Sequence, residues 1–83
     1  MAAEIGAAAT PLLPGVDVLA RDGVRTGAAV RNWSSYADAV VLSAGVEDWQ
    51  RDILCDPQTS GGLLIAVAPE AAPSVRARAI DAG

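Results

Sequence analysis

The spacing of hydrophobic and polar residues predicts two short helices in the first two thirds of the chain. Hydrophobic residues recur at helical spacing over residues 12–20, and Gly23 follows at the position where a left-handed residue ends a helix. The same spacing recurs over residues 46–54. Pro57 ends this second helix, because a proline disfavours the helical conformation of the residue before it. Between the helices, the polar and glycine residues of 26–32 predict turns.

Two apolar runs predict β-strands, and a third helix follows them. Residues 39–42 form a short run rich in β-branched side chains. Every residue from 63 to 68 is apolar, which is typical of a strand that is covered on both faces. Pro69 suits the first turn of the third helix. Pro73 either kinks this helix or moves its start to about Ala72.

The order of these elements predicts an α+β fold, with a mixed β-sheet layer covered by helices. The chain has 83 residues, which is enough for one small domain or for part of one. A chain of this length buries only about 60–65% of its unfolded surface, so it is marginal as a free-standing fold. Only 4% of its residues are aromatic. We therefore expect residues 1–83 to be a partial domain that packs on something else.

Charge and composition argue against several functions. The formal net charge is −4, the chain has no Lys or His, and its six Arg form no cluster, so we expect no nucleic-acid partner. A single Cys cannot form an internal disulfide, which favours a reducing, cytoplasmic location. No apolar run approaches the roughly 18–20 residues that span a bilayer, so we expect no membrane partner. Residues 1–10 lack the features of a signal peptide.

The strongest candidate site is a polar, glycine-rich turn between the second helix and the second apolar run. Its residues are Asp56, Pro57, Gln58, Thr59, Ser60, Gly61 and Gly62. Two consecutive glycines let a backbone approach a ligand closely and adopt positive φ, while Thr59 and Ser60 add hydroxyl donors. Asp56 can accept hydrogen bonds or bind a cation. The alternative is a structural turn whose polar side chains bond to its own backbone.

This turn carries a resemblance to a known family. Residues 55–67 read Cys-Asp-Pro-Gln-Thr-Ser-Gly-Gly-Leu-Leu-Ile-Ala-Val, and Pro69 and Glu70 follow shortly after. This string resembles the C-terminal domain of selenophosphate synthetase (selenide, water dikinase), in the aminoimidazole ribonucleotide synthetase-like superfamily. The resemblance implies that the chain is a partial C-terminal domain of that fold, a mixed sheet covered by helices, and that the N-terminal catalytic and ATP-binding domain is absent.

Two upstream segments support the resemblance, which is strongest over residues 11–83. Residues 11–15 resemble a family segment that precedes an amphipathic helix. Gly27 and Asn32 resemble a family turn that usually reads Gly-Gly-Thr before a later Asn. Two alanines stand here in place of the second Gly and the Thr.

The resemblance implies an enzyme that makes selenophosphate from selenide, ATP and water, with release of AMP and phosphate. Such enzymes need Mg²⁺ and pair their subunits through their N-terminal domains, so the parent is expected to be a homodimer. The implied partner of this chain is the missing N-terminal domain of the same enzyme. The family's catalytic Cys or selenocysteine, its Lys and its Mg²⁺-binding aspartates lie on segments without a counterpart here. The chain alone is therefore expected to be inactive and to bind neither ATP nor Mg²⁺.

The site residues that the resemblance implies are confined to a substrate cleft. The candidates are Asp56, Gln58, Thr59, Ser60, Gly61, Gly62 and Asn32; none is catalytic and none is a metal ligand. Cys55 is expected to be structural and partly buried, because free Cys is usually buried and the neighbouring carboxylate disfavours a reactive thiolate.

Two other functions remain open. One is that of another kinase or ligase of the same superfamily, such as thiamine-monophosphate kinase, although those proteins usually show a different string at this turn. Alternatively, the chain is a stand-alone, non-catalytic module for binding or assembly. The presence or absence of the catalytic segments in the gene upstream of Met1 separates an enzyme from such a module.

Overall fold

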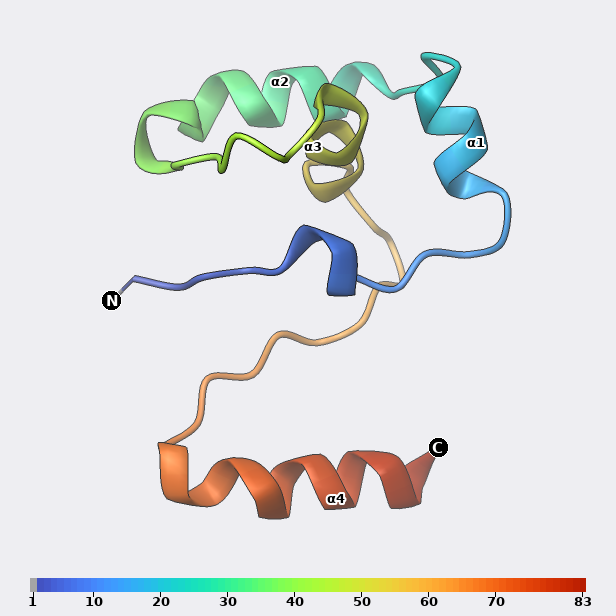
Figure 1. The fold of residues 1–83 in the computed structure, drawn as a ribbon. Helices are drawn as coiled ribbons and strands as arrows, with labels where there is room; N and C mark the ends of the chain where they lie inside the picture. Colours follow the sequence, from blue (N-terminus) through green and yellow to red (C-terminus); the bar gives the residue numbers. More distant parts are fainter. Residues whose placement is uncertain (1) are drawn as a thin grey trace.

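The computed structural model describes residues 2–83 and shows a cluster of three helices with a long arm (Figure 1). In chain order its elements are η1 (Ala7–Ala9), α1 (Val16–Arg21), α2 (Gly27–Tyr36), η2 (Ala37–Ala39), α3 (Asp48–Leu54), η3 (Pro69–Ala71) and α4 (Ala72–Ala82), where η denotes a 3₁₀ helix. Both α1 and α2 pack against α3. Residues 57–83, which we call the C-terminal arm, run as extended chain into η3 and α4, and α4 lies apart from the helical cluster.

The predicted α+β fold, with its mixed β-sheet layer, is wrong, because residues 2–83 contain no strand. Residues 39–42 start in η2 and continue as irregular chain, and residues 63–68 have no regular structure. A strand is stable only where a neighbour takes up its backbone hydrogen bonds. The backbone of residues 59–67 makes no such bond with the backbone of any described residue. Both runs have side chains that favour a strand, but neither has a neighbouring strand to pair with.

The predicted end of the first helix is confirmed. Gly23 has a φ of 91°, the left-handed conformation that glycine adopts readily. The Gly23 N–H donates to the Ala20 carbonyl at 3.0 Å, and the Val24 N–H donates to the Leu19 carbonyl at 3.1 Å. This pair of bonds is a Schellman motif, which satisfies carbonyls that the helix end leaves free. The helix starts later than predicted, after Gly15, which also has a positive φ of 87°.

Helix α2 was not predicted, because its glycine and polar residues resemble a series of turns. Thr26 starts the helix as its N-cap, with its side-chain oxygen accepting a hydrogen bond from the Ala29 N–H at 3.0 Å. Threonine is a favoured residue at this position, and the alanines that follow Gly27 are strong helix formers. This combination was the signal in the sequence that the turn interpretation overlooked.

The other two predicted helices are confirmed. At the start of α3, the Gln50 side-chain oxygen accepts a hydrogen bond from the Glu47 N–H at 2.9 Å, which supplies one of the two bonds of a capping box. The helix ends at Leu54, with Cys55 as its C-cap, before the proline that was expected to end it. Of the two possibilities for the third helix, the later start is correct, since α4 begins at Ala72 with Pro73 in its first turn.

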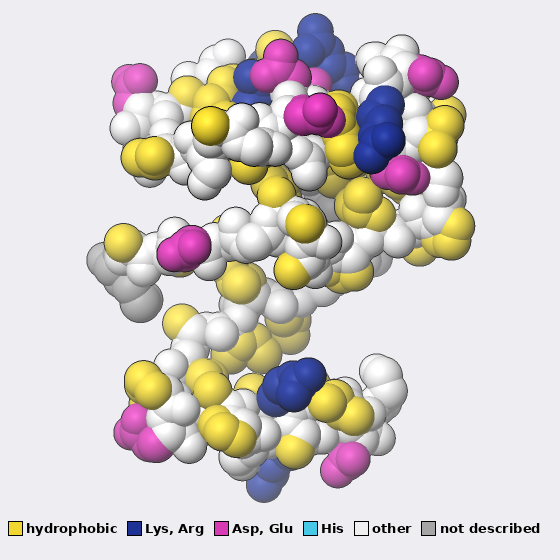
Figure 2. Space-filling view, viewed as in Figure 1, with side chains coloured by type: hydrophobic (Ala, Val, Ile, Leu, Met, Phe, Trp, Pro, Cys, Tyr) yellow, Lys and Arg dark blue, Asp and Glu magenta, His cyan; other side chains and the backbone are white. Residues whose placement is uncertain are grey.

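Very little of the chain is buried. Among residues 2–83, only Ala29 and Cys55 have buried side chains, and they lie where α2 meets the end of α3. The Cα radius of gyration is 14.7 Å, larger than the roughly 12 Å expected for a compact domain of this length. Figure 2 shows hydrophobic side chains at the surface of both the helical cluster and the arm. None of the helices within residues 2–83 has the length and apolar character needed to cross a membrane.

Candidate functional site

The first part of the predicted turn takes part in a set of hydrogen bonds that joins α2 to the end of α3. The Thr26 hydroxyl donates to Asp56 Oδ1 at 2.7 Å, and the Gln58 side-chain amide donates to Asp56 Oδ2 at 2.8 Å. The Asn32 side-chain amide donates to the Cys55 carbonyl oxygen at 2.8 Å. We call these residues the Asp56 junction: Thr26, Asn32, Cys55, Asp56 and Gln58.

Thr26 is the member of the junction that the sequence analysis missed as a site residue. Its hydroxyl oxygen accepts the N-cap hydrogen bond from the Ala29 N–H while its proton is donated to Asp56. One atom therefore holds both the first turn of α2 and the carboxylate at the start of the glycine-rich turn. Its place as a threonine directly before a helix was the available signal.

The structure brings some of the predicted site residues together and leaves others apart. Asn32, Asp56 and Gln58 lie in the junction, although Asn32 bonds to the backbone of Cys55 and not to a side chain of the turn. Residues 59–62 lead away from the junction and are exposed. The predicted site residues therefore fall into two groups: Asn32, Asp56 and Gln58, which are hydrogen-bonded in the junction, and residues 59–62, which are exposed.

The two glycines of the turn differ in how closely their neighbours approach them. Neither Gly61 nor Gly62 has a positive φ, so the turn does not use the left-handed conformation that glycine allows. Gly61 is nevertheless restricted in space, because a Cβ added there would lie 3.0 Å from Cβ of Gln58. A Cβ on Gly62 would meet nothing within 4 Å. Only at the first glycine would a side chain be crowded.

The residues of the junction do not fit a magnesium site. Both carboxylate oxygens of Asp56 already accept hydrogen bonds from Thr26 and Gln58. Within residues 2–83, no group of three or more His, Cys, Asp or Glu side chains is placed to hold a metal ion. Hard cations such as Mg²⁺ need several oxygen ligands in near-ideal geometry. We therefore assign no metal-dependent step to these residues.

Cys55 is buried, as expected of a structural cysteine, with 6% of its surface exposed. Hydrogen bonding to the Cys55 side chain raises the pKa of the Tyr36 phenol above its ordinary value of 10.0, and burial raises it further. The Tyr36 ring meets the Trp33 ring edge to face, with 6.5 Å between the ring centroids. Cys55 is therefore part of the packing between α2 and α3.

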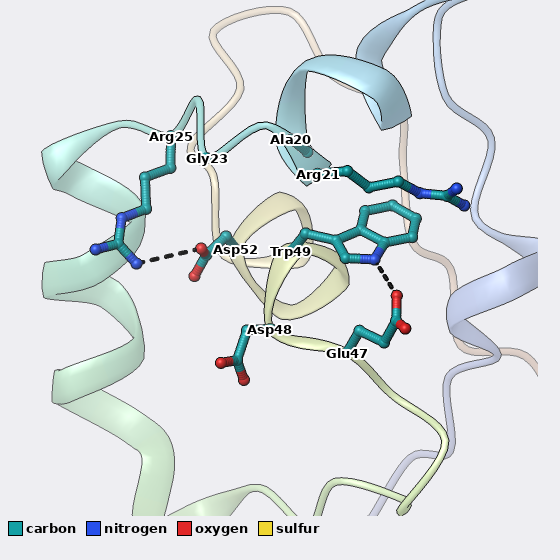
Figure 3. Close-up of a pocket in the computed structure, with 8 residues that line it drawn as sticks. All are labelled: Ala20, Arg21, Gly23, Arg25, Glu47, Asp48, Trp49 and Asp52. Atoms are coloured by element: carbon teal, nitrogen blue, oxygen red, sulfur yellow. Dashed lines mark hydrogen bonds and ion pairs between the residues drawn. The ribbon is translucent and has the colours of Figure 1, made fainter.

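A separate cavity of about 630 Å³ lies between α1 and α3 (Figure 3). The Arg21 guanidinium lies over the Trp49 ring, 4.7 Å from its centroid, and the Trp49 indole N–H donates to the Glu47 carboxylate. Across the cavity, Arg25 pairs with Asp52 at 3.4 Å. Because these charged groups are already engaged by neighbours, the cavity is best explained as polar packing between the helices.

Several proteins of known identity that are similar to this chain carry the name of a kinase. Three of them, each named selenide, water dikinase, illustrate the similarity. The protein from Pseudomonas straminea is 43% identical over 83 residues, which is 100% of this chain and 23% of the relative. The one from Burkholderia pseudomallei is 47% identical over the same share of both chains. The one from Rhizobium meliloti is 56% identical over 64 residues, 77% of this chain and 18% of the relative.

These comparisons confirm the predicted resemblance to selenophosphate synthetase. The chain spans only 18% to 23% of the length of these relatives, so it corresponds to one segment of each of them. No protein-family model matches the chain, and no solved structure matches it. The relationship therefore rests on sequence identity.

Proposed function

We propose that this chain is part of an ATP-dependent selenide, water dikinase. The observation that carries the proposal is the identity of 43% to 47% with proteins of that name over all 83 residues. In this proposal the parent enzyme forms selenophosphate from selenide, ATP and water, releases AMP and phosphate, and requires Mg²⁺. It works in the cytoplasm as a homodimer.

Within that parent, residues 1–83 form part of the C-terminal domain and are inactive alone. The sequence has no Lys to bind phosphate, and the Asp56 carboxylate is committed to Thr26 and Gln58. The catalytic groups, the Mg²⁺ ligands and the ATP site belong, in this proposal, to the N-terminal domain of the same enzyme. That domain is the partner of this chain.

The glycine-rich turn is proposed to contribute to the substrate cleft. The side chains of Thr59 and Ser60 are exposed, and the backbone N–H groups of Gly61 and Gly62 have no backbone partner among the described residues. Fixed hydroxyl and N–H donors are the groups that bind phosphate oxygens and other anions. The Asp56 junction would position this segment without contacting the substrate itself.

A chimaera tests the proposal directly. The matching segment of the Pseudomonas straminea enzyme, which aligns with all 83 residues, is replaced by this chain, and selenide-dependent release of AMP from ATP is measured. We expect an active chimaera, because the segment would supply the same part of the domain. The chain alone is expected to release no AMP, with or without selenide.

The same experiment separates the alternatives. A folded but inactive chimaera would favour a non-catalytic module, and selenide-dependent AMP release by the chain alone would contradict the assignment of the catalytic groups to another domain. Phosphorylation of thiamine monophosphate by the chimaera, in place of selenide-dependent activity, would identify the related kinase.

A further inference from the structure

A continuous series of side-chain contacts runs from the first turn of α2 to the middle of the glycine-rich turn. The Thr26 hydroxyl accepts from the Ala29 N–H at 3.0 Å and donates to Asp56 Oδ1 at 2.7 Å. The other carboxylate oxygen of Asp56 accepts from the Gln58 amide at 2.8 Å. The stem of Gln58 lies beside Gly61, since a Cβ added to Gly61 would lie 3.0 Å from its Cβ and 3.6 Å from its Cγ.

No other hydrogen bond in the described structure restrains residues 59–62. Their backbone has no backbone partner among residues 2–83, and all four residues are exposed. Fixing the backbone of a single residue costs about 1–2 kcal/mol in conformational entropy, so a segment without restraints samples many conformations. The path of this segment therefore depends on Gln58, whose amide is held by Asp56 and whose stem adjoins Gly61.

We propose that Gln58 is a positioning residue, which holds residues 59–62 in place through Asp56 and Thr26 and does not itself contact the substrate. This inference rests on the proposed function, in which the hydroxyl and N–H donors of residues 59–62 bind anionic oxygens. Such donors stabilise developing charge only where they are fixed in advance. A displacement of about 1 Å can lower a rate by about 100-fold. Gln58 and Asp56, first expected in the substrate cleft itself, act on the turn that lines it.

Reversing the donor and the acceptor separates positioning from substrate contact. Gln58→Met keeps the length of the side chain and removes its donor, and Gln58→Glu sets a second carboxylate against Asp56. Combining Asp56→Asn with Gln58→Glu restores the link in the opposite sense. The new amide at position 56 still accepts from Thr26 through its oxygen and donates to the new carboxylate at position 58. The total charge of the chain is unchanged in this double variant.

The {¹H}–¹⁵N heteronuclear NOE of the Gly61 amide in the 83-residue chain tests the link without any measurement of activity, because it reports backbone motion on the picosecond to nanosecond timescale. The Ile65 amide, further along the same extended chain, is the reference. We expect a higher NOE at Gly61 than at Ile65 in the natural chain. Gln58→Met and Gln58→Glu should lower it to the level of Ile65, and the double variant should restore it.

Selenide-dependent AMP release by the chimaera tests the consequence for catalysis. Each single change at Gln58 should lower kcat about tenfold or more, because the donors are displaced. The KM for ATP should stay unchanged, since the ATP site is assigned to the other domain. The double variant should regain most of the lost kcat. Gln50→Ala is the control: it removes a 2.9 Å bond at the start of α3, has no part in the link and should leave kcat unchanged.

Several results would overturn the inference while the unsubstituted chimaera stays active, and so leave the proposed function intact. An NOE or a kcat that is insensitive to Gln58→Met would show that the link does not hold the turn. A double variant that regains the NOE but not kcat would show that Gln58 contacts the substrate. Equal loss of kcat in Gln50→Ala would indicate a general effect on folding. An inactive unsubstituted chimaera instead rejects the proposed function, and the role of Gln58 in the cleft with it.

Discussion

Replacing Thr26 by valine tests whether the Asp56 junction holds helix α2 to the glycine-rich turn. Valine keeps the branched shape of threonine and removes only the hydroxyl. The change therefore deletes two hydrogen bonds at once, the one from the Ala29 N–H at 3.0 Å and the one to Asp56 at 2.7 Å. Neither partner has another bond that replaces the lost one in the described structure.

The expected cost follows from these two bonds. Loss of a threonine N-cap costs about 1 kcal/mol. The bond to the carboxylate lies near solvent, so it contributes about 0.5–1.5 kcal/mol. The free energy of unfolding should therefore fall by roughly 2 kcal/mol, which corresponds to a decrease in Tm of roughly 8–16 °C for a chain of this size.

Urea unfolding followed by circular dichroism and by tryptophan fluorescence measures this change, and coincident curves establish that a single transition is observed. Two control variants separate the contributions. Thr26→Ser keeps the hydroxyl and should stay within about 0.5 kcal/mol of the natural chain. Asp56→Asn keeps the N-cap but leaves one acceptor oxygen in place of two, so the side chain can still accept from Thr26 while the exposed bond from the Gln58 amide is lost; it should cost less than Thr26→Val.

Two outcomes would refute the reasoning. Thr26→Val could unfold at the same urea concentration as the natural chain, in which case the junction does not stabilise the fold. Thr26→Ser could be destabilised as much as Thr26→Val, which would show that the methyl group of Thr26, and not its hydroxyl, is what matters.

Further predictions address the other residues of the site. Asn32→Ala should cost about 1–2 kcal/mol in urea unfolding, because it leaves the part-buried Cys55 carbonyl without its donor; a cost below about 0.5 kcal/mol contradicts this. The raised pKa of Tyr36 means that the folded chain holds the phenolic proton more tightly, so this contribution to stability is complete below pH about 10 and is lost as pH rises through the folded pKa. Ultraviolet titration of a Tyr36→Phe variant against the natural chain measures it, and a transition at the ordinary value of 10.0 contradicts it. Alkylation of Cys55 should be slow in the folded chain and fast in urea, and equal rates would show that the thiol is exposed. In the chimaera, replacing Gly61 and Gly62 by alanine should lower turnover more than stability; equal loss would favour a purely structural turn.

The positions of three helices could be predicted from local signals in the sequence. The Schellman motif at Gly23 and the later start of α4 at Ala72 both depend on residues within one turn of the helix end, and such signals are readable without knowing the fold. Helix α2 escaped prediction because Gly27 and the Arg31-Asn32 pair suggested turns, while the N-cap at Thr26 was not recognised.

The candidate site was only partly predictable for a different reason. The string from Asp56 to Gly62 pointed to the related enzymes, and the same resemblance suggested Asn32 as a site residue. That Asn32 bonds to the Cys55 carbonyl, 23 residues away, depends on how α2 lies against α3. The partnership of Thr26 with Asp56 spans 30 residues and has the same origin.

The local sequence was sufficient to locate helices α1, α3 and α4, to identify the family that the glycine-rich turn resembles and to show that the chain has few large apolar side chains to bury. Tertiary structure decided the fate of the apolar runs at 39–42 and 63–68. Their composition favours strands, but a strand exists only where another backbone completes its hydrogen bonds, and no described part of this chain does so. Tertiary structure likewise converted Asp56 from a candidate ligand-binding carboxylate into the acceptor that joins Thr26 and Gln58, because side-chain pairing depends on distances that no sequence spacing specifies.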